Sequence, residues 1–296
     1  MLYPVIDIGS NTVKIAILDA DRLFSSHPIY FKAVPLGLRS KVENGRLCDC
    51  AIKELGAELA AFQNTAKQYT SQTPLAFATA SLRGLDNVDE VLSYVLSESG
   101  IAVEVLSGDR EAYYSFLGAR RGAMRGTGIV ADLGGGSMEL VTFAGKNIKH
   151  SVSLPIGCLP LYHRYFEGEK DGFNECRAHV HSLLEQGAPP KKDGDLLLCG
   201  GSAKALLKYK NTLENKKNSV IGARQMRRIY HHYINPTLPE HKTMKTILKD
   251  RFRLVPPALA VFEELLDFYK IPRARVCKSG VREGRLFAYL HKLDKN

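Results

Sequence analysis

Two short glycine turns, each preceded by an aspartate, are the first features of this sequence that could do chemistry. Residues 9–11 read Gly-Ser-Asn and begin two positions after Asp7, while residues 134–136 are three glycines that begin two positions after Asp132. Backbone N–H groups without a side chain above them can approach an anion closely, as phosphate binding requires. One such turn usually just joins two strands, but two matched turns predict a phosphate-binding site.

The carboxylates beside these turns predict a divalent cation. Asp7 and Asp132 would end the strands before the turns, where carboxylate oxygens suit Mg²⁺; the competing interpretation is that each only caps its own turn. Glu139 lies on the strand that returns from the second turn, where an acidic side chain among apolar residues needs a partner. Arg83 follows a short apolar run and suits bidentate phosphate binding, although a surface arginine is the default interpretation.

The elements that must position these residues repeat along the chain. Each turn is flanked by two apolar, β-rich runs and is therefore expected to join the strands of a hairpin. The two segments match with an offset of 125 residues, which aligns Asp7 with Asp132 and Thr12 with Ser137. This repeat predicts an α/β protein of two lobes, each of which offers one hairpin turn to a shared cleft.

A third glycine pair lies where a strand gives way to a helix. Residues 195–199 read as a buried strand that runs into Gly200-Gly201-Ser202, and a helix is expected from Ala203 with Ser202 as its N-cap. Residues 220–270 read as helices.

The formal net charge of +10 is unevenly distributed. Residues 204–295 hold 21 Lys and Arg against 8 Asp and Glu. A concentrated positive field captures polyanions such as polyphosphate, nucleic acid or acidic lipid headgroups, whereas the plainer interpretation is a solvated basic face. Nucleic acid is not expected as a partner because the chain has no recognisable reader motif and few aromatic residues among these cations.

Hydropathy and cysteine content indicate in which cellular compartment the protein is expected. No window reaches the roughly 18 consecutive apolar residues of a membrane span, and the chain opens directly on the VIDIGSNT run, so a soluble, cytoplasmic protein without a membrane partner is expected. The six cysteines include no C-x-x-C pair, which fits free thiols in a reducing compartment. A metal site on Cys48 and Cys50 is not expected, since no His lies near them in the sequence.

Seven segments together resemble the exopolyphosphatase/guanosine pentaphosphate phosphohydrolase (Ppx/GppA) family of the actin, Hsp70 and sugar kinase superfamily. In chain order they are IDIGSNTVKIAI, FATASLRGLDN, VLSGDREAYYSFLG, ADLGGGSMELV, SLPIGCLPLYHRYF, LCGGSAKAL and SGVREGRLFAYL. The resemblance spans nearly the whole chain and is to the short, two-domain form of the family. It implies a two-lobed, actin-like (ribonuclease H-like) fold with an interlobe cleft. The N-terminal lobe would be residues 1–122, with the helix of residues 281–296 packing back on it, and the C-terminal lobe residues 123–280.

The resemblance also implies roles for individual residues. Glu111 would be the base that activates the attacking water, whereas the residues alone mark it only as an acid in the first turn of a helix. Asp132 and Glu139 would position metal and water, Asp7 would assist the metal, and the cofactor would be Mg²⁺ or another divalent cation. The residues expected to hold the substrate are Ser10, Asn11, Thr12, Lys14, Arg83, Gly134, Gly135, Gly136, Ser137, Gly200, Gly201 and Ser202.

The expected function is that of an exopolyphosphatase, which releases the terminal phosphate of inorganic polyphosphate by in-line attack of water. One alternative is a guanosine pentaphosphate phosphohydrolase of the same family. Another is a non-catalytic, actin-like nucleotide or polyanion sensor, against which Glu111, Asp132 and Glu139 argue. A sugar or acetate kinase of the same superfamily would be distinguished by ATP-dependent phosphorylation. A homodimer is left open.

Overall fold

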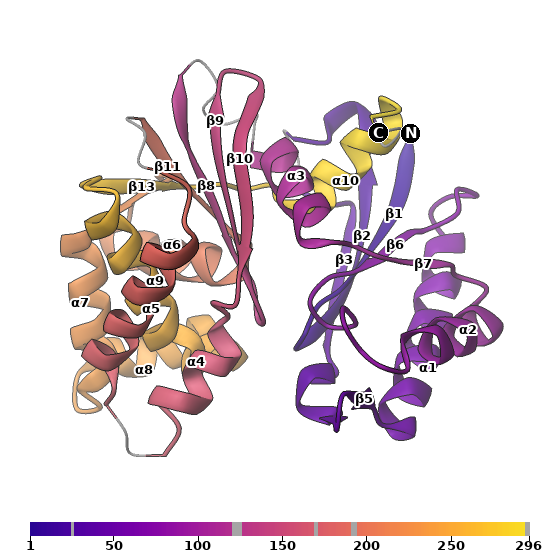
Figure 1. Ribbon diagram of the computed structural model, residues 1–296, viewed down its shortest axis with the longest axis horizontal. Helices are drawn as coiled ribbons and strands as arrows, with labels where there is room; N and C mark the ends of the chain where they lie inside the picture. The colour runs from indigo at the N-terminus through magenta and orange to yellow at the C-terminus, as the bar shows by residue number, and fades with distance from the viewer. Residues whose placement is uncertain (25–26, 120–125, 169–170, 191–193, 294–296) are drawn as a thin grey trace. The chain divides into compact units, whose positions relative to one another are not determined.

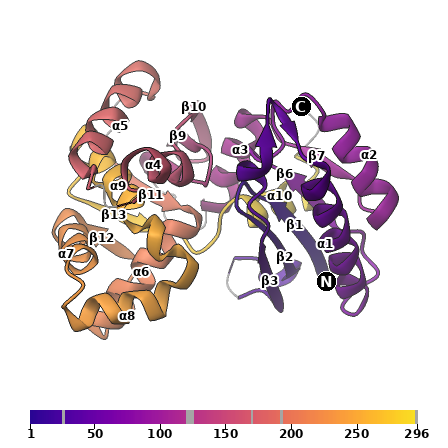
Figure 2. The same ribbon diagram turned by 90° about the horizontal axis from the view of Figure 1, so that it is seen from below.

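The protein forms two compact units. The computed structural model describes residues 1–24, 27–119, 126–168, 171–190 and 194–293 (Figures 1 and 2). Unit 1 comprises Met1–Gly118 and Val281–Asn296, and unit 2 comprises Ala119–Gly280. The predicted boundary between residues 122 and 123 lies outside the described residues, as does the predicted helix beyond residue 293. The cleft that the sequence predicts stays a prediction.

Unit 1 is built on a five-stranded sheet in the order β3-β2-β1-β6-β7. The β1, β2 and β3 strands are antiparallel neighbours, whereas β1, β6 and β7 run parallel. Its strands are β1 (Leu2–Ile8), β2 (Thr12–Asp19), β3 (Tyr30–Pro35), β6 (Leu75–Ala78) and β7 (Val103–Val105), beside the small ladder of β4 (Val42–Glu43) and β5 (Arg46–Leu47). Its helices are α1 (Asp49–Lys67), α2 (Val88–Ser99), α3 (Gly108–Ala119, whose last residue is assigned to unit 2) and α10 (Val281–Leu290), with short 3₁₀ turns η1 (Ala20–Arg22) and η2 (Leu38–Lys41).

Alternation along β1 and β2 assigns their side chains to two faces. Ile6 and Ile15 belong to the core cluster that contains the apolar residues of α1 and α2. Successive strand residues point to opposite faces, so Asp7 and Lys14 lie on the other face. Helix α10 contacts β1 and packs closely on α3, because a Cβ at Gly284 would lie 2.9 Å from the backbone nitrogen of Gly118. The C-terminal helix therefore belongs to the same unit as the first strands (Figure 1).

Unit 2 repeats this plan on a six-stranded sheet in the order β10-β9-β8-β11-β13-β12. The β8, β9 and β10 strands are antiparallel neighbours, β8, β11 and β13 run parallel, and β12 is antiparallel to β13. Its strands are β8 (Thr127–Leu133), β9 (Met138–Ala144), β10 (Asn147–Leu154), β11 (Asp195–Cys199), β12 (Val220–Gly222) and β13 (Arg273–Val276). Its helices are α4 (Cys158–Tyr165), α5 (Phe173–Gly187), α6 (Gly200–Glu214), α7 (Ala223–Ile234), α8 (Pro239–Leu248), the 3₁₀ helix η4 (Lys249–Leu254) and α9 (Val255–Phe268).

One core cluster of unit 2 lies on one face of this sheet. Ile129, Ala131 and Leu133 of β8 pack in one cluster with apolar residues of α4 to α9. Because strand residues alternate, Asp132 points to the opposite face of the sheet. The α/β class predicted from the sequence is confirmed, and the two sheets share the antiparallel-then-parallel order expected of an internal repeat.

The structure also bears on the cysteines and on membrane spans. The structure pairs Cys48 and Cys50 as a disulfide at the start of α1, so the expectation that all six cysteines are free thiols is wrong for these two. Their proximity is local, since two positions separate them and Cys48 is the N-cap of α1. In the described parts of the chain, no helix is both long enough and apolar enough to span a membrane.

Candidate active site

The first glycine turn joins β1 to β2 in unit 1. The Gly9 N–H donates to the Thr12 carbonyl over 3.1 Å, and a Cβ at Gly9 would lie only 3.1 Å from that oxygen, which explains the glycine. Ser10 is buried, and its hydroxyl has no hydrogen-bond partner among the described residues. The Asn11 amide nitrogen lies 3.4 Å from the Thr12 hydroxyl. A buried hydroxyl without a partner is costly, so Ser10 is a good candidate to bind a ligand oxygen.

Asp7 and Lys14 form an ion pair at the base of this turn. They are register partners across the hairpin, and the Lys14 Nζ lies 2.9 Å from an Asp7 carboxylate oxygen. Both side chains are only partly exposed. The predicted metal ligand Asp7 therefore already has a cationic neighbour, and the predicted substrate residue Lys14 is held beside the turn.

The predicted base Glu111 and the predicted phosphate ligand Arg83 contact each other directly. Their side chains form a salt bridge in which a terminal guanidinium nitrogen donates to the carboxylate, and Glu111 is buried. Arg83 also has a buried Nε without a hydrogen-bond partner in the described structure. The loop that carries Arg83 is fixed to the end of β1, because the Ser81 hydroxyl donates to the Ile8 carbonyl over 2.5 Å. The structure thus brings Arg83 and Glu111 together at the same end of β1 as the first turn.

The second glycine turn joins β8 to β9 and packs against the start of α4 in unit 2. The Gly134 N–H donates to the Ser137 carbonyl over 2.9 Å, as in the first turn. The first amides of α4, from Cys158 and Leu159, donate to the carbonyls of residues 134 and 135. A Cβ at Gly157 would lie 2.5 Å from the Gly135 carbonyl oxygen, so the approach requires glycine. The turn is therefore held on its carbonyl side by a helix N-terminus.

Two buried carboxylates lie on the strands beside this turn. Asp132 and Glu139 are register partners on β8 and β9, with 8% and 1% of their surfaces exposed. One oxygen of Glu139 accepts hydrogen bonds from the hydroxyls of Ser137 at 2.9 Å and Ser153 at 2.8 Å. These two hydroxyls orient the Glu139 carboxylate, and Ser153 was not anticipated from the sequence because it comes from the neighbouring strand β10.

The third glycine pair lies against Asp132. Gly200 has φ of +91°, and a Cβ there would lie 2.5 Å from the Leu133 carbonyl oxygen and 3.0 Å from an Asp132 carboxylate oxygen. A side chain is excluded by both the backbone conformation and the space. The helix α6 begins at Gly200 with Cys199 as its N-cap, so the prediction that Ser202 caps a helix beginning at Ala203 is wrong. Ser202 instead lies in the first turn of α6, with its hydroxyl 3.5 Å from the Cys158 sulfur.

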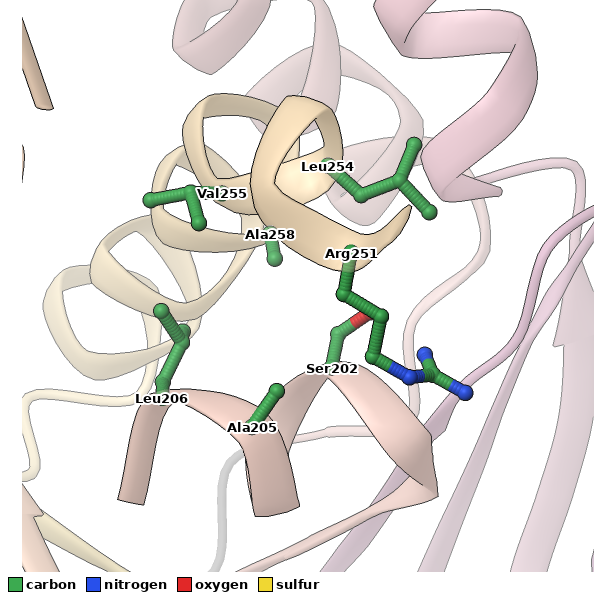
Figure 3. A pocket seen from close by; sticks show the side chains of 7 residues that line it. All are labelled: Ser202, Ala205, Leu206, Arg251, Leu254, Val255 and Ala258. Atoms are coloured by element: carbon green, nitrogen blue, oxygen red, sulfur yellow. The ribbon is translucent and has the colours of Figure 1, made fainter. Parts of the chain in front are cut away.

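Arg251 is a site residue that the sequence reasoning missed. A Cβ at Gly201 would lie 2.5 Å from the Arg251 Cζ, so the guanidinium covers the start of α6. Arg251 lines a small hollow with Ser202 and Leu206, and Figure 3 shows Arg251 reaching over Ser202 with its guanidinium pointing away from Leu206. Burial raises the pKa of the Cys158 thiol to about 11, with the Arg251 charge acting in the opposite sense. Only the packing of η4 against α6 and α4 reveals this position.

The donor set of unit 2 suits Mg²⁺ better than that of unit 1. In the described residues no cluster of three or more His, Cys, Asp or Glu is arranged to hold a metal. Mg²⁺ commonly takes only one or two carboxylates and completes its shell with water and substrate phosphate oxygens, so Asp132 and Glu139 fit. A cation beside Asp7 would be repelled by Lys14, which lies within ion-pair distance.

The structure therefore divides the predicted site residues between the two units. Unit 1 carries Asp7, Ser10, Asn11, Thr12, Lys14, Arg83 and Glu111, and unit 2 carries Asp132, Gly134, Gly135, Gly136, Ser137, Glu139, Gly200, Gly201 and Ser202. Within each unit the residues gather at one end of the parallel strands.

Comparisons with known proteins show the family of the chain. A sequence model of the Ppx/GppA phosphatase family matches residues 32–293. An uncharacterized protein of Streptomyces coelicolor is 35% identical over 174 residues, and Exopolyphosphatase 1 of Mycobacterium leprae is 32% identical over 177 residues; each alignment covers 58% of this chain and 52% of the relative. These alignments thus span about half the length of those two relatives. Exopolyphosphatase 1 of Mycobacterium tuberculosis is 25% identical over 318 residues, covering 99% of this chain and 89% of that protein.

Solved structures share the fold. A Ppx/GppA family member of Aquifex aeolicus superposes with a TM-score of 0.82 at 23% identity, covering 100% of this chain and 99% of that one. An exopolyphosphatase of Cytophaga hutchinsonii superposes with a TM-score of 0.81 at 20% identity, covering 99% of this chain and 98% of that one.

Proposed function

The chain belongs to the Ppx/GppA phosphatase family, as its motifs predict, and from this premise we propose that it is an exopolyphosphatase that hydrolyses the terminal phosphoanhydride bond of inorganic polyphosphate. The observation that carries the proposal is the arrangement in unit 2, where the buried pair Asp132 and Glu139 lies beside the second glycine turn, the glycine start of α6 and the Arg251 guanidinium. A helix N-terminus and a guanidinium together attract a multiply charged anion, and a carboxylate pair suits the cation that accompanies it.

Each unit contributes part of the proposed chemistry. In unit 2, the backbone amides of Gly135 and Gly136 and the Arg251 guanidinium hold the terminal phosphate, while the Ser137 hydroxyl orients Glu139. Mg²⁺ held by Asp132 and Glu139 would neutralise charge on its oxygens. The family resemblance implies further phosphate donors in unit 1, at Ser10 and Lys14. These groups stabilise charge that develops on the phosphoryl oxygens.

The hydrolytic step requires Arg83 to change partner. Glu111 is bonded to Arg83 in this structure. An incoming phosphate competes for the guanidinium, since phosphate also accepts bidentate hydrogen bonds from arginine. Glu111 then accepts the proton of the attacking water as the water oxygen bonds to phosphorus, the bridging P–O bond breaks, and the shortened polymer leaves with that bridging oxygen.

Polyphosphate is the preferred substrate in this proposal for two reasons. Several curated relatives are named exopolyphosphatases. The strongly basic last third of the chain also suits a repetitive anion better than a single nucleotide. Guanosine pentaphosphate remains the alternative substrate, while the cytoplasmic location and the homodimer stay predictions.

The proposal is tested by measuring phosphate release side by side on polyphosphate, guanosine pentaphosphate and ATP, with and without Mg²⁺. We expect Mg²⁺-dependent release that is fastest on polyphosphate. Faster turnover of guanosine pentaphosphate would transfer the assignment to the alternative substrate. Binding of polyphosphate without release from any of the three would support the non-catalytic sensor.

A further inference from the structure

The 3₁₀ helix η4 leads away from the phosphate site and carries three cations. Its sequence alternates Lys249, Arg251 and Arg253, against the single acid Asp250. Arg251 covers the glycine start of α6, whereas Lys249 and Arg253 are exposed. η4 therefore continues the positive charge of the site onto the surface of unit 2.

Arg253 is held in a defined position beside the site. Its Cζ lies 5.8 Å from the centre of the Tyr162 ring, a cation–π geometry. Tyr162 lies on α4, whose first amides bind the carbonyls of the second glycine turn at Cys158 and Leu159. Tyr162 lies four positions after Cys158 on α4, a rise of about 6 Å. The side chain against which Arg253 packs is therefore carried about one helical turn along α4 from the turn proposed to receive the terminal phosphate.

Neighbouring side chains add charge of both signs. Lys245 of α8 lies over the ring of Phe252, 5.3 Å from its centre, which brings one more cation to η4. On α4, His163 is paired with Glu167 at 3.1 Å. The five Lys and Arg residues of η4 and α8 outnumber their two acids, Glu240 and Asp250, so the surface beside Arg253 favours an anion.

A second basic segment of unit 2, helix α7, begins at the end of the sheet opposite the site. Helix α7 carries Arg224, Arg227 and Arg228 but follows β12, which is antiparallel to β13. Gly222, just before α7, pairs with Arg273 at the first residue of β13, whereas the site lies beyond the last residue of the parallel strands. Arg224, in the first turn of α7, therefore starts at the edge of the sheet opposite the site.

We propose that Arg253, held against Tyr162 next to Arg251, forms a second anion subsite that binds phosphates further along the chain than the two that follow the one being hydrolysed. The proposal rests on the proposed function, and it assigns capture of the polymer to η4 instead of to the basic last third as a whole. Substrates with several further phosphates reach this subsite, and a short substrate does not. Arg253 therefore sets the preference for chain length.

The test compares Arg253→Gln with Arg224→Gln, a matched loss of one exposed arginine on the opposite edge of the same sheet. Equilibrium binding of long-chain polyphosphate to the intact protein is measured first, because it needs no turnover. We expect Arg253→Gln to weaken binding about tenfold, as for a lost charge-assisted hydrogen bond, and to reduce the slope of log affinity against log salt by about one. Arg224→Gln should leave both values unchanged.

Kinetics then separate this subsite from the cleavage site. For Arg253→Gln, KM should rise about tenfold on long-chain polyphosphate and stay unchanged on triphosphate, with kcat unchanged on both. Unchanged triphosphate turnover also shows that the variant is folded. Tyr162→Leu, which keeps apolar volume but removes the ring face, should raise the long-chain KM to a smaller extent.

Three results would overturn the subsite. Unchanged binding of long-chain polyphosphate by Arg253→Gln removes it outright. If Arg253→Gln raises KM on triphosphate as much as on long-chain polyphosphate, Arg253 belongs to the cleavage site instead. If Arg224→Gln weakens polyphosphate binding as much as Arg253→Gln does, the loss reflects only the overall positive charge of the protein. Failure of the wild-type protein to release phosphate is a separate result that rejects the proposed function, and the binding comparison still decides the subsite.

Discussion

Glu139 on β9 is the register partner of Asp132 on β8, so two buried carboxylates share one face of the sheet in unit 2. At the equivalent point of unit 1, Asp7 is the register partner of Lys14 and is bonded to it. The same hairpin therefore carries two acids in one unit and an oppositely charged pair in the other. Since two carboxylates face each other in unit 2, whereas the carboxylate of unit 1 faces a lysine, we expect the cation at the hairpin of unit 2.

Neutralising the carboxylates of unit 2 should weaken the Mg²⁺ dependence of the reaction. We expect Asp132→Asn and Glu139→Gln each to raise the Mg²⁺ concentration for half-maximal rate about tenfold or more and to lower kcat about a hundredfold, with partial recovery at high Mg²⁺. Asp7→Asn is the matched control from unit 1 and should change the Mg²⁺ requirement far less. An Asp7→Asn effect as large as that of Asp132→Asn would contradict the assignment of the cation to unit 2.

Glu111→Gln should abolish turnover while leaving substrate binding nearly intact. The amide keeps the size of the side chain but cannot accept the proton of the attacking water, and general-base contributions are typically about a hundredfold to ten-thousandfold. The measurement is kcat from steady-state phosphate release, together with the affinity for polyphosphate. Near-normal turnover in this variant would exclude Glu111 as the base and make Glu139 the next candidate.

Because Arg83 and Glu111 form a salt bridge, the effects of substituting them on kcat/KM should not be additive in free energy. Arg83→Gln should lower kcat/KM about a hundredfold, because it removes a phosphate ligand and the partner of Glu111. Since the two side chains touch, the double variant should lose less than the product of the two single losses. Fully multiplicative losses would show that the two residues act independently.

The packing of α4 on the second glycine turn can be tested at Gly157. Gly157→Ala places a Cβ 2.5 Å from the Gly135 carbonyl oxygen, so the turn must shift. We expect a loss of roughly 1–3 kcal/mol in the free energy of unfolding and a raised KM. Gly126→Ala is the control, because a Cβ at that position meets nothing within 4 Å. Equal behaviour of the two variants in urea denaturation and kinetics would show that α4 does not constrain the turn.

Replacing each of two adjacent glutamates of α9 by glutamine should change the free energy of unfolding in opposite directions at about pH 7. Burial raises the pKa of Glu263 above its ordinary value of 4.5, and one of its buried oxygens has no hydrogen-bond partner among the described residues. The folded state then binds more protons than the unfolded state above pH 4.5, so this group's contribution to stability is lost as pH rises through the raised pKa. Glu263→Gln should therefore be more stable than the wild type at about pH 7 and lose this advantage below the unfolded pKa.

Glu264 is the internal control for that measurement. Its carboxylate accepts two hydrogen bonds from Arg177, at 2.9 and 3.1 Å, and contacts a ring nitrogen of His181 at 2.8 Å. Removing one partner of a buried ion pair typically costs about 3–5 kcal/mol, so Glu264→Gln should be destabilised at about pH 7. Urea denaturation of both variants across the pH range measures whether each substitution raises or lowers the free energy of unfolding. Destabilisation of Glu263→Gln at about pH 7 would contradict the burial argument.

The hairpins and the repeat were predictable because their signals are local. Alternating apolar residues fix which side chains share a face, and the offset of 125 residues aligns Asp7 with Asp132 without any tertiary information. The start of α6 was predicted less well, because Gly200 adopts a positive φ that lets the helix begin before Ser202. A three-residue strand, Val220–Gly222, was read as helix because its pairing partner on β13 is distant in the sequence.

Other residues of the site were beyond sequence reasoning for a physical reason. Arg251 acquires its position only when η4 folds back on the start of α6, and Ser153 reaches Glu139 only through the pairing of β10 with β9. The lysine opposite Asp7 was expected to bind substrate, but its ion pair depends on the hairpin register. Contacts made across strands and helices leave little trace in a single sequence.

The most direct test of the central claim is one time course on long-chain polyphosphate with Mg²⁺ that follows both free phosphate and residual chain length. We expect free phosphate to account for all of the polymer lost and to appear from the first time point, without fragments of intermediate size produced by internal cleavage. Glu139→Gln should reduce release about a hundredfold in the same assay. Polymer shortened to internal fragments without equivalent free phosphate, or no loss of polymer at all, would contradict terminal hydrolysis by this protein.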